Sequence, residues 1–233
     1  IRGVKMVQAA ILSGALVLGN MALADAQDFS IPITGKEAAY DGIRSGTDGN
    51  YTYTFGAGDY LTISDSSALT GIDISGSTRS IGINGLELSI GQKDRYPVLK
   101  GVKLYGDGKS FSMDSGKVTV SSENTSMTAD AYGIYVESNG QTVTLGDLAI
   151  SASAITGGEN ATAYALSTSN LDNTIEGGDL VLTASAKSAQ YASASGITAW
   201  QNAGDTSLPG STIGLKDLSV TVSAEVTGAD GEA

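Results

Sequence analysis

Apolar and polar residues alternate at period two along most of the chain after residue 25. Clear runs are Phe29, Ile31 and Ile33; Leu86, Leu88 and Ile90; Val118 and Val120; Ile134 and Val136; and Leu148 and Ile150. Asp-Gly, Gly-Asp, Ser-Gly and Asn-Gly steps separate the runs, and these residues favour turns. No stretch there keeps apolar residues at helical spacing for three turns. The pattern therefore predicts an all-β chain of short strands.

Segments of the second half also resemble one another. Ile134, Leu166 and Ile197 follow the same kind of Gly-Ile or Ala-Leu step and are spaced by 32 and 31 residues. Leu148 and Leu180, in the Gly-Asp-Leu steps that follow, are 32 residues apart, and Leu218 comes 38 residues later because residues 203–210 add a loop. Upstream, the run Gly116–Ser122 fits the same slot, with Val118 placed 30 residues before Leu148. Four copies at a period near 31 residues indicate a repeat architecture.

A copy of this size holds about three short strands and cannot bury its aliphatic side chains alone. Stacking the copies would place Leu148 over Leu180 and Leu218, with Ser151, Thr183 and Thr221 facing outward. Helical crossovers and the Trp-Asp signature of propellers are both missing. We therefore expect a parallel β-helix (β-solenoid) with repeats of about 30 residues. Residues 25–76 are less regular and are expected to form the N-terminal cap and first coils, and residues 77–233 the solenoid repeats.

Residues 1–24 have a different character. Arg2 and Lys5 precede a mostly apolar run over residues 7–18, and Ala22 and Ala24 are small residues at the two positions that a signal peptidase reads. This order is typical of a secretory signal-peptide helix. The apolar run is too short for a stable membrane anchor. We expect cleavage after Ala24. Because the sequence opens on Ile and stops at residue 233 without a closing signal, we also expect a fragment truncated at both ends.

Composition narrows the function classes. The 233 residues include 13 Lys and Arg, 25 Asp and Glu, no His and no Cys, for a net charge of −12. The Ser-His-Asp triad, thiol nucleophiles, zinc fingers and disulfides are therefore excluded. Nucleic acid is an unexpected partner, since phosphate binding needs clustered basic residues. Residues 118–233 carry 2 − 13 = −11, so most of the acidity belongs to the repeats.

A signal sequence followed by Gly-Ile, Thr-Val-Thr-Leu and Gly-Asp-Leu-x-Ile-x-Ala copies resembles the passenger region of bacterial autotransporters (type V secretion). The resemblance covers residues 1–24 and 116–233. It implies a right-handed β-helix that is exported through a C-terminal outer-membrane barrel of the same polypeptide. The barrel is absent from this chain. The family further implies a surface-displayed or released protein, often an adhesin, with a cell-surface glycan or protein as partner.

Several residue groups are candidates for chemistry. Asp114-Ser115-Gly116 matches one half of the aspartic-protease signature, but catalysis needs a second Asp and no second copy occurs, so a turn before the Val118–Val120 strand is the preferred interpretation. Calcium ligands could come from Asp107 and Asp114, from Asp41, Asp48 and Asn50, or from the Gly177-Gly178-Asp179 step. Calcium prefers such oxygen donors. Solvated turn acids explain these residues better, and no metal or other cofactor is expected.

Two further sets bear on function. A polysaccharide-acting enzyme needs a basic residue close to carboxylates. The candidates for this basic residue are Arg79, Lys93, Arg95 and Lys103. Aromatic residues recur on or beside the Gly-Ile step of the repeat: Tyr132, Tyr135, Tyr164, Tyr191 and Trp200. They could form an exposed platform that binds a sugar or a protein, or they could pack inside the fold.

We expect a non-enzymatic adhesin. A β-helical lyase or glycosidase, or a structural spacer for a distal domain, are the alternatives. Acids converging on Arg79 or Lys103 would favour the enzyme, and a smooth Ser/Thr face the adhesin.

Overall fold

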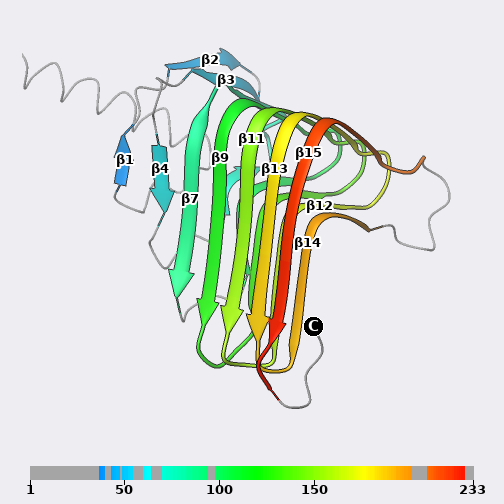
Figure 1. Ribbon diagram of the computed structural model, residues 1–233. Coiled ribbons are helices and arrows are strands. Elements are labelled where there is room, and N and C mark those ends of the chain that lie inside the picture. The colour runs from blue at the N-terminus through cyan, green and yellow to red at the C-terminus, as the bar shows by residue number, and fades with distance from the viewer. Residues whose placement is uncertain are drawn as a thin grey trace, which may run out of the picture.

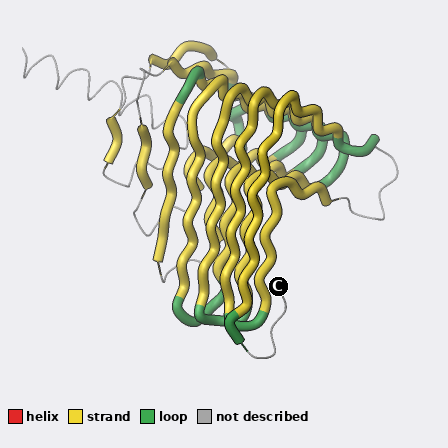
Figure 2. The backbone as a smooth tube through the Cα atoms, viewed as in Figure 1, coloured by secondary structure: helices red, strands yellow, loops and turns green. Residues whose placement is uncertain are grey.

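The computed structural model describes residues 37–39, 43–47, 49–54, 60–63, 70–93, 98–200 and 209–228. Within these ranges all regular structure is β-strand (Figures 1 and 2), and no helix there is long and apolar enough to span a bilayer. The signal sequence at 1–24, with Ala22 and Ala24, lies outside the described residues. So does part of the expected cap at 25–76.

The strands form two sheets. Sheet A contains β1 (Glu37–Ala39), β2 (Ile43–Thr47), β3 (Asn50–Thr54), β4 (Tyr60–Ile63), β6 (Ser80–Ile83), β7 (Leu86–Lys93), β9 (Ser110–Asn124), β11 (Thr142–Thr156), β13 (Thr174–Ser188) and β15 (Thr212–Val226). Sheet B contains β5 (Thr70–Ile74), β8 (Val98–Tyr105), β10 (Ala129–Glu137), β12 (Asn160–Ser169) and β14 (Tyr191–Trp200), in the order β14-β12-β10-β8-β5. Only the β1–β4 and β2–β3 pairs of these strands are antiparallel.

The prediction of a stacked β-solenoid is confirmed. Each coil of the regular part contributes one strand to sheet A and one to sheet B, and residues one coil apart pair in parallel at a spacing of 32, as in Thr142 with Thr174. The expectation of about three short strands per coil fits the coil of β6, β7 and β8, but it is wrong for the later coils. Gly146 and Asp147 lie inside the 15-residue strand β11 instead of breaking it. From β9 onward, each coil therefore has one long strand in sheet A and one bent strand in sheet B.

The register confirms most of the sequence alignment. Leu148 pairs with Leu180 and Leu180 with Leu218, while Ile134 pairs with Leu166 and Leu166 with Ile197. The placement of Val118 opposite Leu148 is wrong, because Val118 pairs with Ile150 and Gly116 with Leu148. A strand that alternates at period two keeps the same faces after a shift of two residues, so the apolar pattern alone does not distinguish the two registers.

The core is a set of aliphatic ladders between the two sheets. Ile72, Leu88, Leu104, Val118, Ile134, Ile150, Leu166 and Leu182 are each at most 1% exposed. The last described coil consists of β14 and β15, and β15 pairs only with β13 and packs against β14. The inward side chains of β15 are consequently only half covered: Leu218, Val220 and Val222 are 45–47% exposed. Burial thus increases from this last strand into the stack.

Buried amides hold the turns between coils. The Asn173 side chain, 1% exposed, accepts a hydrogen bond from the Gln141 backbone N–H at 2.9 Å and donates to Thr168 Oγ1 at 3.0 Å. The Gln141 side chain donates to the carbonyls of Glu137 and Gly106 at 2.8 and 3.1 Å. Each amide therefore satisfies backbone groups that the turns leave unpaired, in its own coil or in a neighbouring one.

The outer face of sheet A is a regular array of small hydroxyl side chains. Ser89, Thr119, Ser151, Thr183 and Thr221 occupy successive positions of one outward row. Ion pairs join neighbouring coils at its margin, Lys93 with Glu123 at 2.8 Å and Lys187 with Glu225 at 2.6 Å. These pairs are exposed, and such pairs stabilise a fold by about 0–1 kcal/mol each. The outer face of sheet A is thus rich in hydroxyl groups.

Candidate functional site

The strands of sheet B bend, and the bend gathers side chains on the outside. Figures 1 and 2 show β14 turning partway along its length. In β10, Gly133 and Ile134 are both buried, which breaks the alternation, while Tyr132 and Tyr135 on either side of them are only partly buried. On a straight strand, residues three apart face opposite sides. Here the ring centres of Tyr132 and Tyr135 lie 5.0 Å apart, so the bend brings both onto one face.

The parallel register places further residues beside these rings. Tyr132 pairs with Lys100 of β8 on one side and with Tyr164 of β12 on the other, and Tyr135 pairs with Lys103. The Tyr132 and Tyr164 rings meet edge to face with centres 5.5 Å apart, a favourable aromatic geometry. We call the group Lys100, Lys103, Tyr132, Tyr135 and Tyr164 the tyrosine–lysine surface.

The two lysines of this surface have different partners. Lys100 Nζ lies 5.7 Å from the Tyr132 ring centre and 5.1 Å from that of Tyr135, and it makes no ion pair with a described carboxylate. Lys103 Nζ is 3.8 Å from the Glu137 carboxylate and 4.7 Å from the Tyr105 ring centre. The nearest groups that stabilise the Lys100 ammonium are therefore ring faces, with carboxylates acting from farther away, whereas Lys103 has a carboxylate partner at 3.8 Å.

Burial shifts several titrations at this surface. It lowers the pKa of Lys100, with the Lys103 charge adding to the effect, while Glu137, Asp130 and Asp73 oppose it. Burial also raises the pKa of Asp130, which Thr162 and Lys100 partly counteract.

Burial raises the pKa of Tyr132 above the usual tyrosine range, and that of Tyr135 in the same direction, with nearby acids adding to both shifts. Groups with shifted pKa values cluster at functional sites more often than elsewhere.

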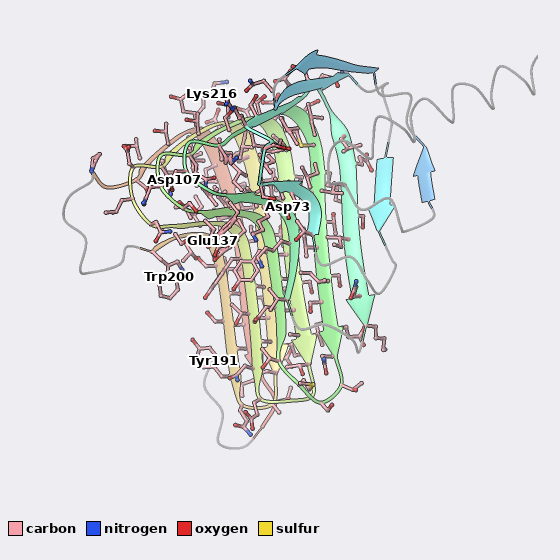
Figure 3. All side chains as sticks on the ribbon, turned by 180° about the vertical axis from the view of Figure 1, so that it is seen from behind. Asp73, Asp107, Glu137, Tyr191, Trp200 and Lys216 are labelled. Carbon is pink, nitrogen blue, oxygen red and sulfur yellow. The ribbon has the colours of Figure 1, made fainter. Side chains whose placement is uncertain are left out.

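A flanking row carries two exposed aromatic side chains. Tyr105, Glu137, Ser169 and Trp200 pair in sequence from β8 to β14, and Tyr105 and Trp200 are 50% and 58% exposed. Figure 3 shows Glu137 and Trp200 on the same side of the molecule. Tyr191, at the other end of β14, lies away from this row in the same view. Tyr105 and Trp200 thus mark the two ends of a row that crosses four strands.

The platform of aromatic residues expected from the sequence is therefore partly present. The structure brings Tyr132, Tyr135 and Tyr164 together and places Trp200 in the adjoining row, whereas Tyr191 does not join them. Sequence reasoning missed Lys100, Asp130 and Tyr105. The 32-residue offset that relates Lys100 to Tyr132 could have found Lys100, but the β8 segment shares no motif with the later copies.

The remaining candidates do not form a site. Asp114, Ser115 and Gly116 lie inside β9, so the expected turn before the Val118 strand is wrong. Asp107 accepts a hydrogen bond from the Asn139 N–H at 3.2 Å in the turn before β9, and Asp114 lies four residues along an extended strand from its start. These two acids, proposed above as joint calcium ligands, are not brought together.

The other calcium candidates have partners or lie outside the described residues. Asp179 lies 3.4 Å from Lys216, and Asn50 Oδ1 accepts from Ser80 at 2.8 Å, while Asp41 and Asp48 are outside. No cluster of three or more acids among the described residues is arranged to hold a metal ion.

The four basic residues considered for a polysaccharide-acting enzyme do not come together in one site either. Arg79 is exposed on the turn before β6, Lys93 pairs with Glu123, and Arg95 is outside the described residues. Lys103 alone of the four lies at the tyrosine–lysine surface.

A depression of about 410 Å³ also lies on the outer face of sheet A, lined by hydroxyl groups including those of Thr52, Ser112 and Thr144. Of the described side chains that line it, none is charged.

No family model, no curated protein and no solved structure matches this chain. The case for function therefore depends on the side chains of the tyrosine–lysine surface and its flanking row.

Proposed function

We propose that the chain is the passenger part of an exported bacterial β-solenoid, displayed at the cell surface, which mediates adhesion or surface interaction without catalysis. The observation that carries the proposal is the convergence of three tyrosines and two lysines on the outer face of sheet B. Tyrosine is among the residue types that contribute most to binding energy at interfaces. Their partner would be a glycan or a protein of another cell surface.

The export part of the proposal is supported by the sequence. Residues 1–24 have the order of a signal peptide, and the absence of Cys suits a chain that stays unfolded until it is outside the cell. The barrel of the same polypeptide would provide the outer-membrane route. N-terminal sequencing of secreted protein should give a start at Asp25. A mature protein that retains residues 1–24 would contradict the export proposal.

Binding is tested with the full chain on an array of immobilised cell-surface glycans and extracellular-matrix proteins. Tyr105→Ala removes an exposed ring beside Lys103, and Tyr191→Ala removes a similarly exposed ring from the far end of β14. We expect at least one ligand to capture the wild-type chain, with about tenfold weaker capture of Tyr105→Ala and unchanged capture of Tyr191→Ala. Absence of capture, or equal loss in both variants, would refute a binding role of the flanking row and the adjoining tyrosine–lysine surface and would favour a structural spacer.

A polysaccharide-acting enzyme is a second candidate because one observation favours it. Lys103, Glu137 and Asp73 occupy neighbouring positions on β8, β10 and β5, so acids do converge on one of the expected basic residues. Incubation of the chain with neutral and acidic polysaccharides separates the two functions. New reducing ends or unsaturated products that disappear in Lys103→Met would establish the enzyme and exclude the non-catalytic proposal.

A further inference from the structure

The outer face of sheet B has a charged part and an uncharged part. Its first strands carry Asp73 on β5, Lys100 and Lys103 on β8, and Asp130 and Glu137 on β10. Neither β12 nor β14 contains a charged residue, although residues 118–233 as a whole carry a net charge of −11. The outward side chains with exposed surface are Thr162, Tyr164 and Ser169 on β12, and Ser193, Ser195, Thr198 and Trp200 on β14, while Ser167 is covered and 1% exposed. By contrast, β11, β13 and β15 of sheet A carry Asp147, Glu176, Asp179, Lys187, Lys216, Asp217 and Glu225. The β12–β14 part of the face is therefore uncharged and rich in hydroxyl groups, which is complementary to an uncharged ligand that itself carries hydroxyl groups.

The large side chains that are exposed on sheet B are all aromatic. Among the described residues of sheet B they are Tyr105, Tyr191 and Trp200, all aromatic, whereas the exposed aliphatic residues Ile155 and Val181 lie on sheet A. Protein–protein interfaces are also enriched in aromatic residues, so the choice of a sugar over a protein rests on the uncharged, hydroxyl-rich surroundings of these rings. The C–H face of a sugar ring needs only an aromatic ring beneath it and hydroxyl or carboxylate partners around it.

The two aromatic ends of the flanking row are separated by a definite length. Tyr105 and Trp200 lie three strand spacings apart, which corresponds to about 14 Å. Glu137 and Ser169 lie between them and offer oxygen atoms to ligand hydroxyl groups. A single sugar unit cannot touch both rings, while a short oligosaccharide lying across the coils can.

We infer that the outer face of sheet B binds an uncharged oligosaccharide across the coils, between Tyr105 and Trp200. The inference rests on the proposed binding function and specifies its ligand class. Tyr105 and Trp200 stack against sugar rings at the two ends of the row. Glu137, held by Lys103 at 3.8 Å, accepts hydrogen bonds from sugar hydroxyl groups in the middle.

The chain supplies its own probe, because Trp200 is its single tryptophan. The full chain is titrated with uncharged hexose oligosaccharides of the malto, cello and galacto series, from one to six units, and with uronic-acid oligosaccharides of the same lengths. We expect a saturable change in tryptophan fluorescence with at least one uncharged series, at least tenfold tighter for trimers and longer chains than for the monomer. Uronic-acid chains should bind at least tenfold more weakly, since they meet Glu137 and an acidic molecule.

Single substitutions test where the oligosaccharide binds, and folding controls distinguish loss of binding from misfolding. Tyr105→Ala should weaken the uncharged oligosaccharide by about tenfold, Tyr191→Ala should leave it unchanged, and calorimetry with Trp200→Ala should show the same loss as Tyr105→Ala. Unchanged circular dichroism and thermal midpoints establish that each variant folds. Tighter binding of uronic-acid chains, binding independent of length, or no binding in fluorescence and calorimetry would each overturn the inference. If the array captures a protein through Tyr105 while no oligosaccharide binds, the ligand assignment fails and the binding function remains.

Discussion

Lys100 Nζ lies 5.1 Å from the ring centre of Tyr135, a residue of the neighbouring coil, and 5.7 Å from that of Tyr132. The lysine is half-buried, and no described carboxylate comes within ion-pair distance of it. Ring faces stabilise a cation by roughly 0.5–1 kcal/mol at partly exposed sites, which offsets part of the desolvation. The contact therefore links two neighbouring coils, and it involves an ammonium group that is only partly exposed to water.

This arrangement predicts an unusual titration. Burial and the Lys103 charge lower the pKa of Lys100 from its ordinary value of 10.5, whereas the ring faces favour the charged form. In a chain labelled with ¹³C at lysine Cε, the resonance that disappears in Lys100→Arg should titrate below 10.5. Tyr135→Leu should lower its midpoint further by removing one ring face. A midpoint at or above 10.5 would mean that the ammonium is solvated.

Tyr132 predicts a loss of stability in alkaline solution. Its pKa is raised in the folded state, so above pH 10 the unfolded chain releases a proton that the folded chain retains. The folded state then binds more protons than the unfolded state, and the free energy of unfolding falls as pH rises. The stabilisation is complete below pH 10. Urea midpoints measured at pH 9, 10 and 11 should fall less steeply for Tyr132→Phe than for the wild type, and equal slopes would contradict the assignment.

The fold could be predicted because the repeat is explicit in the residues. The 32-residue spacing of Leu148 and Leu180 recurs in the structure as a direct pair, so stacking followed from spacing alone. The earlier coils are less similar to these copies. There the apolar alternation fixes which face is buried but leaves the register open by two residues, which is how Val118 was placed opposite Leu148 instead of Ile150.

The candidate site was only half predictable for a related reason. The tyrosines recur near the Gly-Ile slot and could be grouped from the sequence. Lys100 and Tyr105 come from β8, whose sequence lacks the repeat motifs, so their place beside Tyr132 and Glu137 required the register. The bend at Gly133 could not be predicted from the sequence either. Two consecutive inward-facing residues give the same hydrophobic pattern as the end of a strand.

Substitution of Gly133 tests how tightly the bend in β10 is packed. A Cβ atom there would lie 2.3 Å from Ile150 Cγ2 and 2.4 Å from the Ala165 carbonyl oxygen, so either the side chain or the neighbouring strand must move. Overpacking of this kind costs about 1–3 kcal/mol. Gly133→Ala should lower the free energy of unfolding by that amount. Gly214→Ala is the control, since nothing lies within 4 Å of its Cβ position, and it should change stability by less than about 0.5 kcal/mol. Equal effects would show that the bend is loosely packed.

Leu180 and Leu218 occupy the same position of the repeat in adjacent coils, and they differ mainly in burial. Leu180 is 1% exposed and Leu218 is 46% exposed, because β15 is the last described strand of the stack and no described coil covers its far side. Leu180→Ala leaves a cavity in a closed ladder and should cost about 2–5 kcal/mol. Leu218→Ala removes a side chain that is already half in water and should cost no more than about 1 kcal/mol. Urea unfolding of both variants measures the difference. If Leu218→Ala costs as much as Leu180→Ala, the inward face of β15 is covered in solution, and the last ladder position belongs to the core.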